Sequence, residues 1–534
     1  MKTRIGRALA GAGLFVLVTA PLVSQQRIDI PFKAPKAVTF SMMFSDSGAY
    51  PYKDTWTVFK EIEKATGVHL DAMIVPASEY TNKRNLLVSS GDAPQIIPKT
   101  YPGQEVPFIA SGQILPISDY VSEMPNYMAS IKAWGLADDL KTVTQRDGKY
   151  YVLPMLHQTF SQDYSIAFRT DILKKHKIAV PTTWSEVESV LRKLKTLYPD
   201  IVPFSDRWML GGLFNFSGPS WGVGQSGIRT PGVNWSNGNG LTLDRATDKY
   251  FFYGTSPQYK VMLEYFARLA KDGLMDKESA TQTDEQALNK FQNGKSFMIS
   301  ANLQEVNNMR QKMDSTLGAG QYEVTRINVP AGPAGALLMG NRLENGIMFP
   351  AKIAQDPNFK TLLKFVDWLW YSYSGQELTK WGVKGTTFTE TKGEYKLLPG
   401  YQFPAIGING KEGDLDLRKE FGYSSGVFCL SFGGPDALMY SWMNQEARDF
   451  TALVTKTHTL IPTPAPIPYT EDQLESQNMI QTPLMDYVFQ MTYKFILGQA
   501  DLKTGWDDYV KQCSIKGAER LTTTANEVYK SAKK

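Results

Sequence analysis

Few side chains in this sequence have the types and spacing that metal binding or nucleophilic catalysis requires. The chain has 534 residues, with four histidines and two cysteines. The histidines are scattered and show no metal-ligand spacing; they are His69, His157, His176 and His458. We therefore predict no metal and no cofactor. The sequence leaves open whether Cys429 and Cys513 form a disulfide or remain buried thiols.

A G-x-G-x-x-G spacing at residues 222–227 raises the question of a dinucleotide site. In dinucleotide-binding folds these glycines follow a buried strand and open a helix, whose N-terminal amides hold the pyrophosphate. Here Pro219 precedes the glycines, and the chain runs to Pro231 without a helical period. We therefore predict an aromatic-studded surface loop at this point and no nucleotide site.

The N-terminus has the pattern of a secretory signal peptide. Three basic residues, Lys2, Arg4 and Arg7, precede an apolar run that glycines and Pro21 interrupt. We predict a signal at residues 1–24 and an exported, periplasmic protein; an extracellular protein or an uncleaved membrane anchor is the alternative. A formal net charge of +4 gives no reason to expect nucleic-acid binding.

The elements that must position any site alternate between strands and helices. The pattern predicts a strand at 36–44, a helix ending at Gly67, a strand at 68–75, a helix at 79–90 and a strand at 95–97. This β-α-β-α-β order favours a parallel sheet. Further along the chain, capping signals predict helices that begin after Thr183, Ser256, Thr283, Asp356 and Ser374. The fold class is α/β with a helical C-terminal part, and the length predicts two lobes.

Seven segments, in order along the chain, resemble extracellular solute-binding proteins of carbohydrate ABC importers, specifically the alginate/aldouronate oligosaccharide-binding type. They lie at residues 86–97, 147–154, 168–195, 272–279, 291–299, 365–388 and 493–513. The resemblance implies a two-lobe, type II-like periplasmic-binding-protein fold with hinge crossovers. It also implies a monomer that captures an oligosaccharide, with uronate-containing chains among the candidates, and delivers it to the membrane permease.

The resemblance also implies how the chain divides between the lobes and where it departs from the family. We expect residues 25–158 and about 300–400 in an N-terminal lobe, and residues 159–299 and about 401–534 in a C-terminal lobe. Alginate binders of this type carry a calcium loop after the helix that residues 187–195 resemble. Asp200 and Asp206 lack its spacing and its glycine, so we predict no calcium there.

Sugars are held by aromatic rings on their flat faces and by planar polar groups at their rims. By resemblance, the segment at 206–227 lines the cleft, and the ends of several strands face it. Arg342 is our choice for a uronate carboxylate, with an ordinary salt bridge as the alternative. The predicted contacts are Phe44, Asp46, Tyr101, Met155, His157, Gln158, Trp208, Asn215, Trp221, Asn302, Arg342, Asn345 and Phe432.

Two other functions stay as alternatives. A secreted carbohydrate-active hydrolase or lyase would need paired carboxylates, which 53 acidic residues permit but no spacing singles out. A surface glycan-capture protein built from helical repeats would need helix pairs at a period near 34 residues, and the sequence has no such repeat. Binding without catalysis is therefore the prediction.

Overall fold

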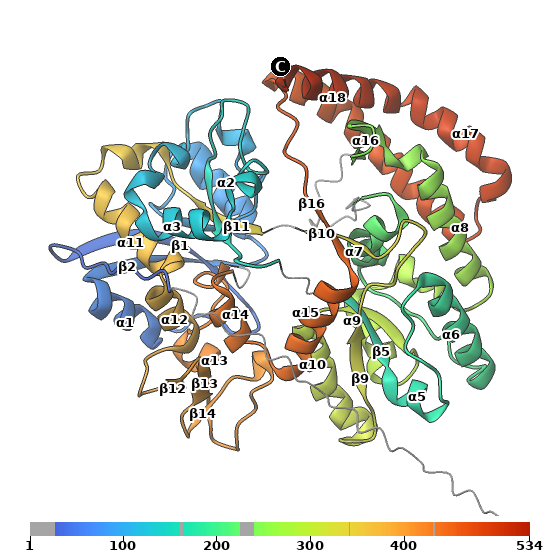
Figure 1. Cartoon of the computed structure of the whole chain (residues 1–534), viewed down its shortest axis with the longest axis horizontal. Coiled ribbons are helices and arrows are strands. Elements are labelled where there is room, and N and C mark those ends of the chain that lie inside the picture. Colours follow the sequence, from blue (N-terminus) through green and yellow to red (C-terminus); the bar gives the residue numbers. More distant parts are fainter. Residues whose placement is uncertain (1–26, 161–163, 225–239, 341, 431–432, 534) are drawn as a thin grey trace, which may run out of the picture.

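The computed structural model describes residues 27–160, 164–224, 240–340, 342–430 and 433–533. The predicted signal peptide lies outside these residues. The described chain forms two α/β lobes that lie side by side (Figure 1). We call residues 27–156 and 343–442 the N-terminal lobe, and residues 165–340 and 445–533 the C-terminal lobe.

The N-terminal lobe is built on the predicted parallel strands. Its larger strands are β1 (Val38–Asp46), β2 (Val68–Pro76), β3 (Ile97–Thr100), β4 (Val152–Leu156) and β11 (Leu343–Met348). β1 pairs with β2 in parallel, and a parallel bridge from Met42 to Ile96 brings β3 to its other side. β11 runs antiparallel to both β3 and β4, so β4 is parallel to β3. The predicted β-α-β-α-β order is confirmed.

Helices and short strands cover this sheet. The helices are α1 (Thr57–Thr66), α2 (Tyr80–Ser90), α3 (Pro125–Trp134), α4 (Ala137–Leu140), α11 (Phe359–Tyr371), α12 (Tyr373–Trp381), α13 (Leu417–Phe421) and α14 (Asp436–Ser441). The short strands are β12 (Phe388–Thr391), β13 (Glu394–Leu397), β14 (Tyr401–Gln402) and β15 (Leu415–Asp416). α1 and α2 end at Gly67 and Gly91, whose left-handed φ values of 74° and 78° favour glycine.

The C-terminal lobe has a small antiparallel sheet with many helices. Its strands are β5 (Ser165–Arg169), β6 (Leu241–Asp244), β7 (Lys249–Phe252), β8 (Met298–Ala301), β9 (Val324–Ile327), β10 (Leu337–Gly340) and β16 (Thr459–Pro462). Its helices are α5 (Thr170–Lys175), α6 (Trp184–Leu197), α7 (Gly211–Trp221), α8 (Pro257–Lys271), α9 (Asp284–Gln292), α10 (Leu303–Met313), α15 (Gln445–Thr457), α16 (Glu471–Ile496), α17 (Leu502–Ile515) and α18 (Ala518–Ala532). β5 lies between β8 and β9, and α16 packs on α8.

Three of the five predicted helix starts are confirmed, and two are shifted. The helix predicted to begin after Asp356 begins at Phe359, with Asn358 as its N-cap. Thr183 and Thr283 form the predicted capping boxes with Glu186 and Gln286. α12, however, is capped by Ser372 and not by Ser374. The Ser374 hydroxyl instead donates to Asp29 at 2.6 Å, a contact between distant segments that local sequence cannot reveal.

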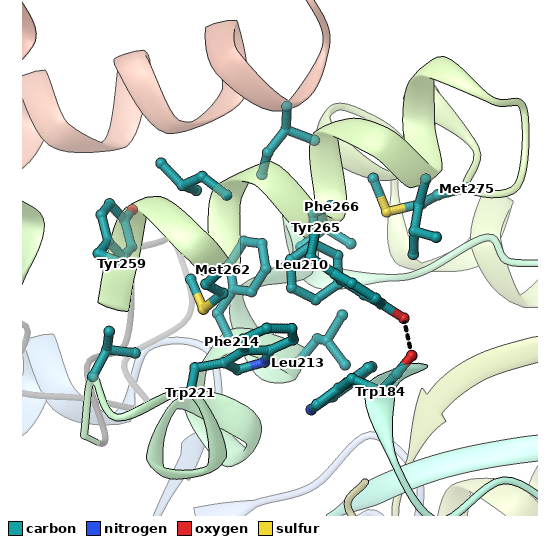
Figure 2. Packing of buried hydrophobic residues seen from close by; sticks show 14 of the residues in the cluster. Trp184, Leu210, Leu213, Phe214, Trp221, Tyr259, Met262, Tyr265, Phe266 and Met275 are labelled. Atoms are coloured by element: carbon teal, nitrogen blue, oxygen red, sulfur yellow. Dashed lines mark hydrogen bonds between the residues drawn. The ribbon is translucent and has the colours of Figure 1, made fainter. Parts of the chain in front are cut away.

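An aromatic core holds the C-terminal lobe together. Trp184 and Trp221 pack against Tyr265 and Phe266, and the Tyr265 hydroxyl donates to the Trp184 carbonyl oxygen at 2.7 Å (Figure 2). Every residue of α7 is buried. The segment before the G-x-G-x-x-G glycines is therefore a core helix, and Gly222 ends that helix instead of following a strand.

The chain passes between the lobes three times, after Leu156, after Gly340 and after Trp442. The expected divisions near residues 300 and 400 lie later, because β9 and α10 complete the C-terminal lobe and residues 401–442 pack on the N-terminal lobe. Cys429 and Cys513 are free buried thiols in different cores, so they do not pair. Among the described helices, none has the length and apolar character needed to cross a bilayer.

Candidate ligand-binding cleft

One edge of the N-terminal lobe's sheet faces the other lobe. β1, β3 and β4 are parallel, so their carboxyl ends, Asp46, Thr100 and Leu156, share an edge. The chain leaves this edge after Leu156 and enters β5 of the C-terminal lobe. Ligands of open α/β sheets bind outside the carboxyl ends of the strands. The edge is therefore the N-terminal wall of a candidate cleft between the lobes.

Two predicted contacts, Asp46 and Tyr101, lie on this wall. Asp46 ends β1, and its Oδ1 accepts a hydrogen bond from the Tyr52 amide at 2.7 Å. Tyr101 follows β3 and is 45% exposed. Its amide donates to Gln104 Oε1, which also accepts a hydrogen bond from buried Arg84 at 2.7 Å. The loop that carries Tyr101 is therefore held in place by Gln104 and the buried Arg84.

His157 and Gln158 lie in the first crossing between the lobes, beside the second crossing at Arg342. The His157 amide donates to the Arg342 carbonyl oxygen at 2.8 Å, and the Gly434 amide donates to the Leu156 carbonyl oxygen at 2.7 Å. The Gln158 side chain accepts a hydrogen bond from the Asp436 amide at 2.9 Å. The His157 ring is buried, with Nε2 3.7 Å from Glu344 Oε1. These contacts join the first two crossings to each other and to the segment before α14. A direct role for either residue in ligand binding stays a prediction.

The structure gives Arg342 a different partner from the one predicted. Its Nη2 lies 2.6 Å from Asp139 Oδ2, and its guanidinium donates to the carbonyl oxygens of Trp134 and Gly135 at 2.8 and 3.0 Å. These carbonyls end α3, where a cation is favourable. Arg342 thus forms an ordinary salt bridge, which was the alternative prediction. This salt bridge connects the segment after α3 to the start of β11.

Five other predicted contacts are buried: Phe44, Met155, Asn215, Trp221 and Asn345. Phe44 packs among Tyr52, Trp56, Phe59 and Phe428. Phe44 and Met155 belong to the core of the N-terminal lobe and Trp221 to that of the C-terminal lobe, because strand and helix ends carry core side chains as well as surface ones. Phe432 lies outside the described residues.

The candidate C-terminal wall is the edge at which β5 begins and at which β8 and β9 end. Ser165 pairs with Ala301, and Ile166 pairs with Ile327. Asn302 follows β8 on this edge, as predicted, but its Oδ1 caps α10 by accepting a hydrogen bond from the Glu305 amide at 2.9 Å. Trp208 lies beside the same edge, because its ring meets that of Tyr164, next to β5, edge-on at 5.9 Å between centroids.

Trp208 begins a left-handed turn made of three residues that are not glycine. Trp208, Met209 and Leu210 have φ values of 54°, 52° and 60°. Each such residue costs about 1 to 3 kcal/mol, and strained backbone of this kind clusters at functional sites. The guanidinium of Arg207 lies 3.9 Å from the centre of the Trp208 ring and is itself held by Asp284 and by Glu305, the latter at 2.9 Å. The ring is therefore fixed before any ligand arrives.

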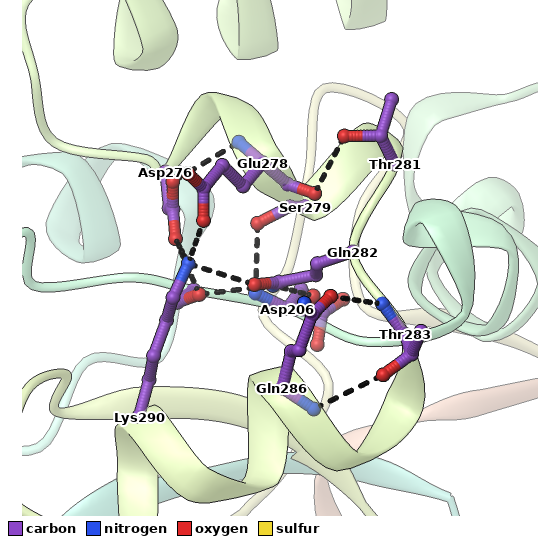
Figure 3. A network of polar contacts seen from close by, with 10 residues as sticks. Asp206, Asp276, Glu278, Ser279, Thr281, Gln282, Thr283, Gln286 and Lys290 are labelled. Carbon is purple, nitrogen blue, oxygen red and sulfur yellow. Dashed lines mark hydrogen bonds and ion pairs between the residues drawn. The ribbon is translucent and has the colours of Figure 1, made fainter.

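A buried polar network supports this turn (Figure 3). Asp206 is fully buried, and its carboxylate accepts hydrogen bonds from the Ser300 amide at 2.7 Å and the Ser300 hydroxyl at 2.9 Å. Gln282 donates to the Asp206 carbonyl oxygen at 2.6 Å and accepts from Lys290 at 2.9 Å. Burial raises the pKa of Asp206 to about 6, although the hydrogen bonds from Ser300 oppose that rise.

Asp206 should make the stability of the protein depend on pH. Its pKa is about 6 in the folded state and near 3.8 in an unfolded chain, so between these values the folded state binds more protons. Its contribution to the free energy of unfolding should therefore fall as pH rises from about 4 to about 6. We expect Asp206→Asn to reduce the fall in the free energy of unfolding between about pH 4 and pH 6 by about 1 to 3 kcal/mol. Urea unfolding at each pH measures the effect, and parallel wild-type and variant curves would contradict it.

Three residues on the N-terminal wall were not predicted: Tyr50 after β1, Lys99 in β3 and Arg418 in α13. Lys99 has a φ of 54°, unusual for a lysine. The sequence offered a weak signal for Lys99, since it stands two residues before the predicted contact Tyr101. Arg418 lies in an acidic stretch far along the chain and gave no signal of its own.

A hollow of about 920 Å³ lies in the C-terminal lobe, apart from the predicted contacts. It is bounded by the β6–β7 hairpin and by the first turns of α8 and α18. No predicted contact lines it. Within the described residues, no group of three or more His, Cys, Asp or Glu side chains is placed to hold a metal ion.

Comparisons with known proteins agree with this architecture. Residues 47–369 match the model of the family described as bacterial extracellular solute-binding protein. The chain is 23% identical to the lipoprotein LipO of Bacillus subtilis, with 89% of each chain covered. It is also 23% identical to the fructooligosaccharide ABC transporter substrate-binding protein FusA of Streptococcus pneumoniae, covering 98% of this chain and 95% of FusA.

Solved structures share the fold. The alginate-binding protein AlgQ2 without calcium ion superposes with a TM-score of 0.67 at 16% identity, covering 94% of this chain and all of that one. FusA in complex with kestose gives a TM-score of 0.64 at 20% identity, covering 93% of this chain and 99% of that structure's chain. The two-lobe α/β fold excludes the helical-repeat alternative, and the family match excludes the hydrolase or lyase alternative. The chain belongs to the bacterial extracellular solute-binding proteins, which bind a solute without transforming it.

Proposed function

We propose that this protein is the substrate-binding component of an ABC importer, which captures an oligosaccharide between its lobes and delivers it to the membrane permease. The observation that carries the proposal is the pair of sheet edges joined by the crossing from β4 to β5, with Tyr101 on one edge and the pre-positioned Trp208 beside the other. Aromatic rings of this kind stack on the C–H faces of sugars. Closure of the lobes would be driven by contacts that the ligand makes better in the closed form.

The names of the relatives support the carbohydrate class. FusA is named for fructooligosaccharides, and YtcQ of Bacillus subtilis, 22% identical, is named for polygalacturonan and rhamnogalacturonan. AlgQ2 is named for alginate. Two of these three names are acidic polysaccharides, so a uronate-containing ligand belongs to the proposal. We further propose that the protein is exported, acts in the periplasm and functions as a monomer.

Titration with oligosaccharides tests this function. We expect one class of tri- to hexasaccharide to raise the melting temperature by a few degrees at 100 times its Kd, since ligand binding to the folded state stabilises it by about 2.7 kcal/mol there. Small-angle X-ray scattering should show a smaller radius of gyration with the same sugar. Monosaccharides serve as the control. If no neutral or acidic oligosaccharide changes either measurement, the proposed function is wrong.

A further inference from the structure

Among the described residues, two cations on the N-terminal wall have no carboxylate that neutralises their charge. Within the described residues, neither the Lys99 ammonium nor the Arg418 guanidinium has a hydrogen-bonded or ion-paired partner. Arg418 is only 5% exposed, and its Nε is buried. Its guanidinium lies 4.7 Å from the centre of the Tyr50 ring. A buried cation without a carboxylate is costly unless a ligand supplies the charge.

The nearby carboxylates are engaged elsewhere. Asp416 caps α13 by accepting hydrogen bonds from the amides of Arg418 and Lys419 at 2.8 and 3.1 Å. Glu420 pairs with Lys53 at 2.7 Å. Asp46 accepts a hydrogen bond from the Tyr52 amide. The charge of the two cations therefore remains uncompensated by the wall on which they lie.

Gly426 keeps a space open between the Lys99 ammonium and the Tyr50 hydroxyl. A Cβ atom at this glycine would lie 3.3 Å from Lys99 Nζ and 3.4 Å from the Tyr50 hydroxyl. The ammonium and the hydroxyl therefore lie beside the same small space, and Arg418 stacks on the ring that carries the hydroxyl. All three side chains come from segments on the carboxyl edge that faces the other lobe or pack against those segments.

A third cation, Lys380, raises the positive potential of this region. Lys380 is fully buried, and its ammonium donates to the Gly433 carbonyl oxygen at 3.2 Å and lies 4.8 Å from the centre of the Trp442 ring. Lys380 and Arg418 both lie near enough to Cys429 to oppose the rise that burial causes in its thiol pKa. Burial also lowers the pKa of Lys99 below its usual value. An anion bound here would relieve the cost of holding these charges together.

We propose that Lys99, Arg418 and Tyr50, around the space left by Gly426, form a subsite for the carboxylate of an acidic sugar residue. This inference rests on the proposed function and deepens it by naming the substrate class. The carboxylate would accept hydrogen bonds from the ammonium and the hydroxyl and would neutralise the guanidinium. A neutral sugar would leave the cations unpaired, so the subsite selects for uronate-containing chains.

Calorimetric titration of matched sugars tests the subsite. The probes are the trisaccharides of galacturonate, of alginate and of an aldouronate, each beside its counterpart with the carboxyl reduced to CH₂OH. We expect wild-type protein to bind at least one acidic trisaccharide and to prefer it over the reduced form. Lys99→Met and Arg418→Met should each weaken that binding about 10- to 100-fold and leave the reduced form unchanged, because each removes a charged donor.

The controls separate this subsite from the function on which it rests. Lys360→Met removes an exposed cation of the same lobe, which pairs with Glu123, and should change nothing. Gly426→Leu fills the space and should weaken acidic binding while both cations remain. Neither methionine variant loses an ion pair, although Arg418→Met also loses the contacts of the guanidinium with the rings of Tyr50 and Phe403. The melting temperature of Lys99→Met without ligand should therefore not fall. Should Arg418→Met fail to fold, Lys99→Met, Gly426→Leu and Tyr50→Phe carry the test.

Each outcome decides one claim. Binding of neutral but not acidic sugars would overturn the subsite and leave the proposed function standing. Acidic binding that the Lys99 and Gly426 variants do not weaken would also overturn the subsite. Absence of binding to every sugar would overturn both.

Discussion

Replacing Trp208 by alanine should weaken oligosaccharide binding by about 30-fold, the largest loss that we expect from one side chain on the C-terminal wall. An aromatic side chain buries about 150 to 250 Å² when it is fully covered, and losing about 80 Å² of such contact with a sugar costs about 2 kcal/mol, which corresponds to this change in Kd. The ring is pre-positioned by Arg207 and by the left-handed turn, so little ordering cost offsets the contact. Isothermal titration calorimetry measures the change.

Trp208→Tyr is the matched variant, since it keeps a ring on the same strained backbone. It should retain most of the affinity. The melting temperature without ligand should change little in the tyrosine variant, which distinguishes a lost contact from a damaged turn. Equal affinity of wild type and Trp208→Ala for every sugar that binds would remove Trp208 from the cleft.

Replacing Trp221 by alanine should have the opposite profile, with a large loss of stability and no direct effect on binding. Trp221 is buried against Trp184, Tyr265 and Phe266, at ring separations of 5.8, 5.1 and 6.1 Å. Truncating a buried tryptophan to alanine costs about 3 to 5 kcal/mol. Urea unfolding should show this loss, and the Kd measured at low temperature, where the variant is folded, should match that of wild type.

Trp221→Phe is the control for volume. Trp221 Nε1 has no hydrogen-bond partner among the described residues, so phenylalanine forfeits no hydrogen bond and should cost about 1 to 2 kcal/mol. A Trp221→Ala protein as stable as wild type but with weakened binding would place this ring in the cleft after all.

Local sequence signals predicted the elements of this fold well. Capping boxes at Thr183 and Thr283 and glycine stops at Gly67 and Gly91 need only neighbouring residues, and the structure confirms all four. α7 escaped prediction because every one of its residues is buried. A helix that is covered on all sides has no amphipathic period to detect.

The site could be predicted only in part, because its contacts join distant segments. The partner of Arg342 is Asp139, some two hundred residues earlier in the chain, and no local pattern links them. The lobe divisions were misplaced for the same reason, since the packing of residues 401–442 is non-local. Trp208 was predicted at the cleft, but a left-handed turn built without glycine has no sequence signature.

The odd number of passages between the lobes has a practical consequence. After an even number, the first and last residues of the described chain would belong to the same lobe. Here Ile28 accepts a hydrogen bond from Tyr373 in the N-terminal lobe, whereas Leu521 lies in the core of the C-terminal lobe. Fluorophores attached near residue 27 and residue 533 would therefore sit on separate moving bodies. Energy transfer between them would follow lobe closure in real time, without a label in the binding cleft.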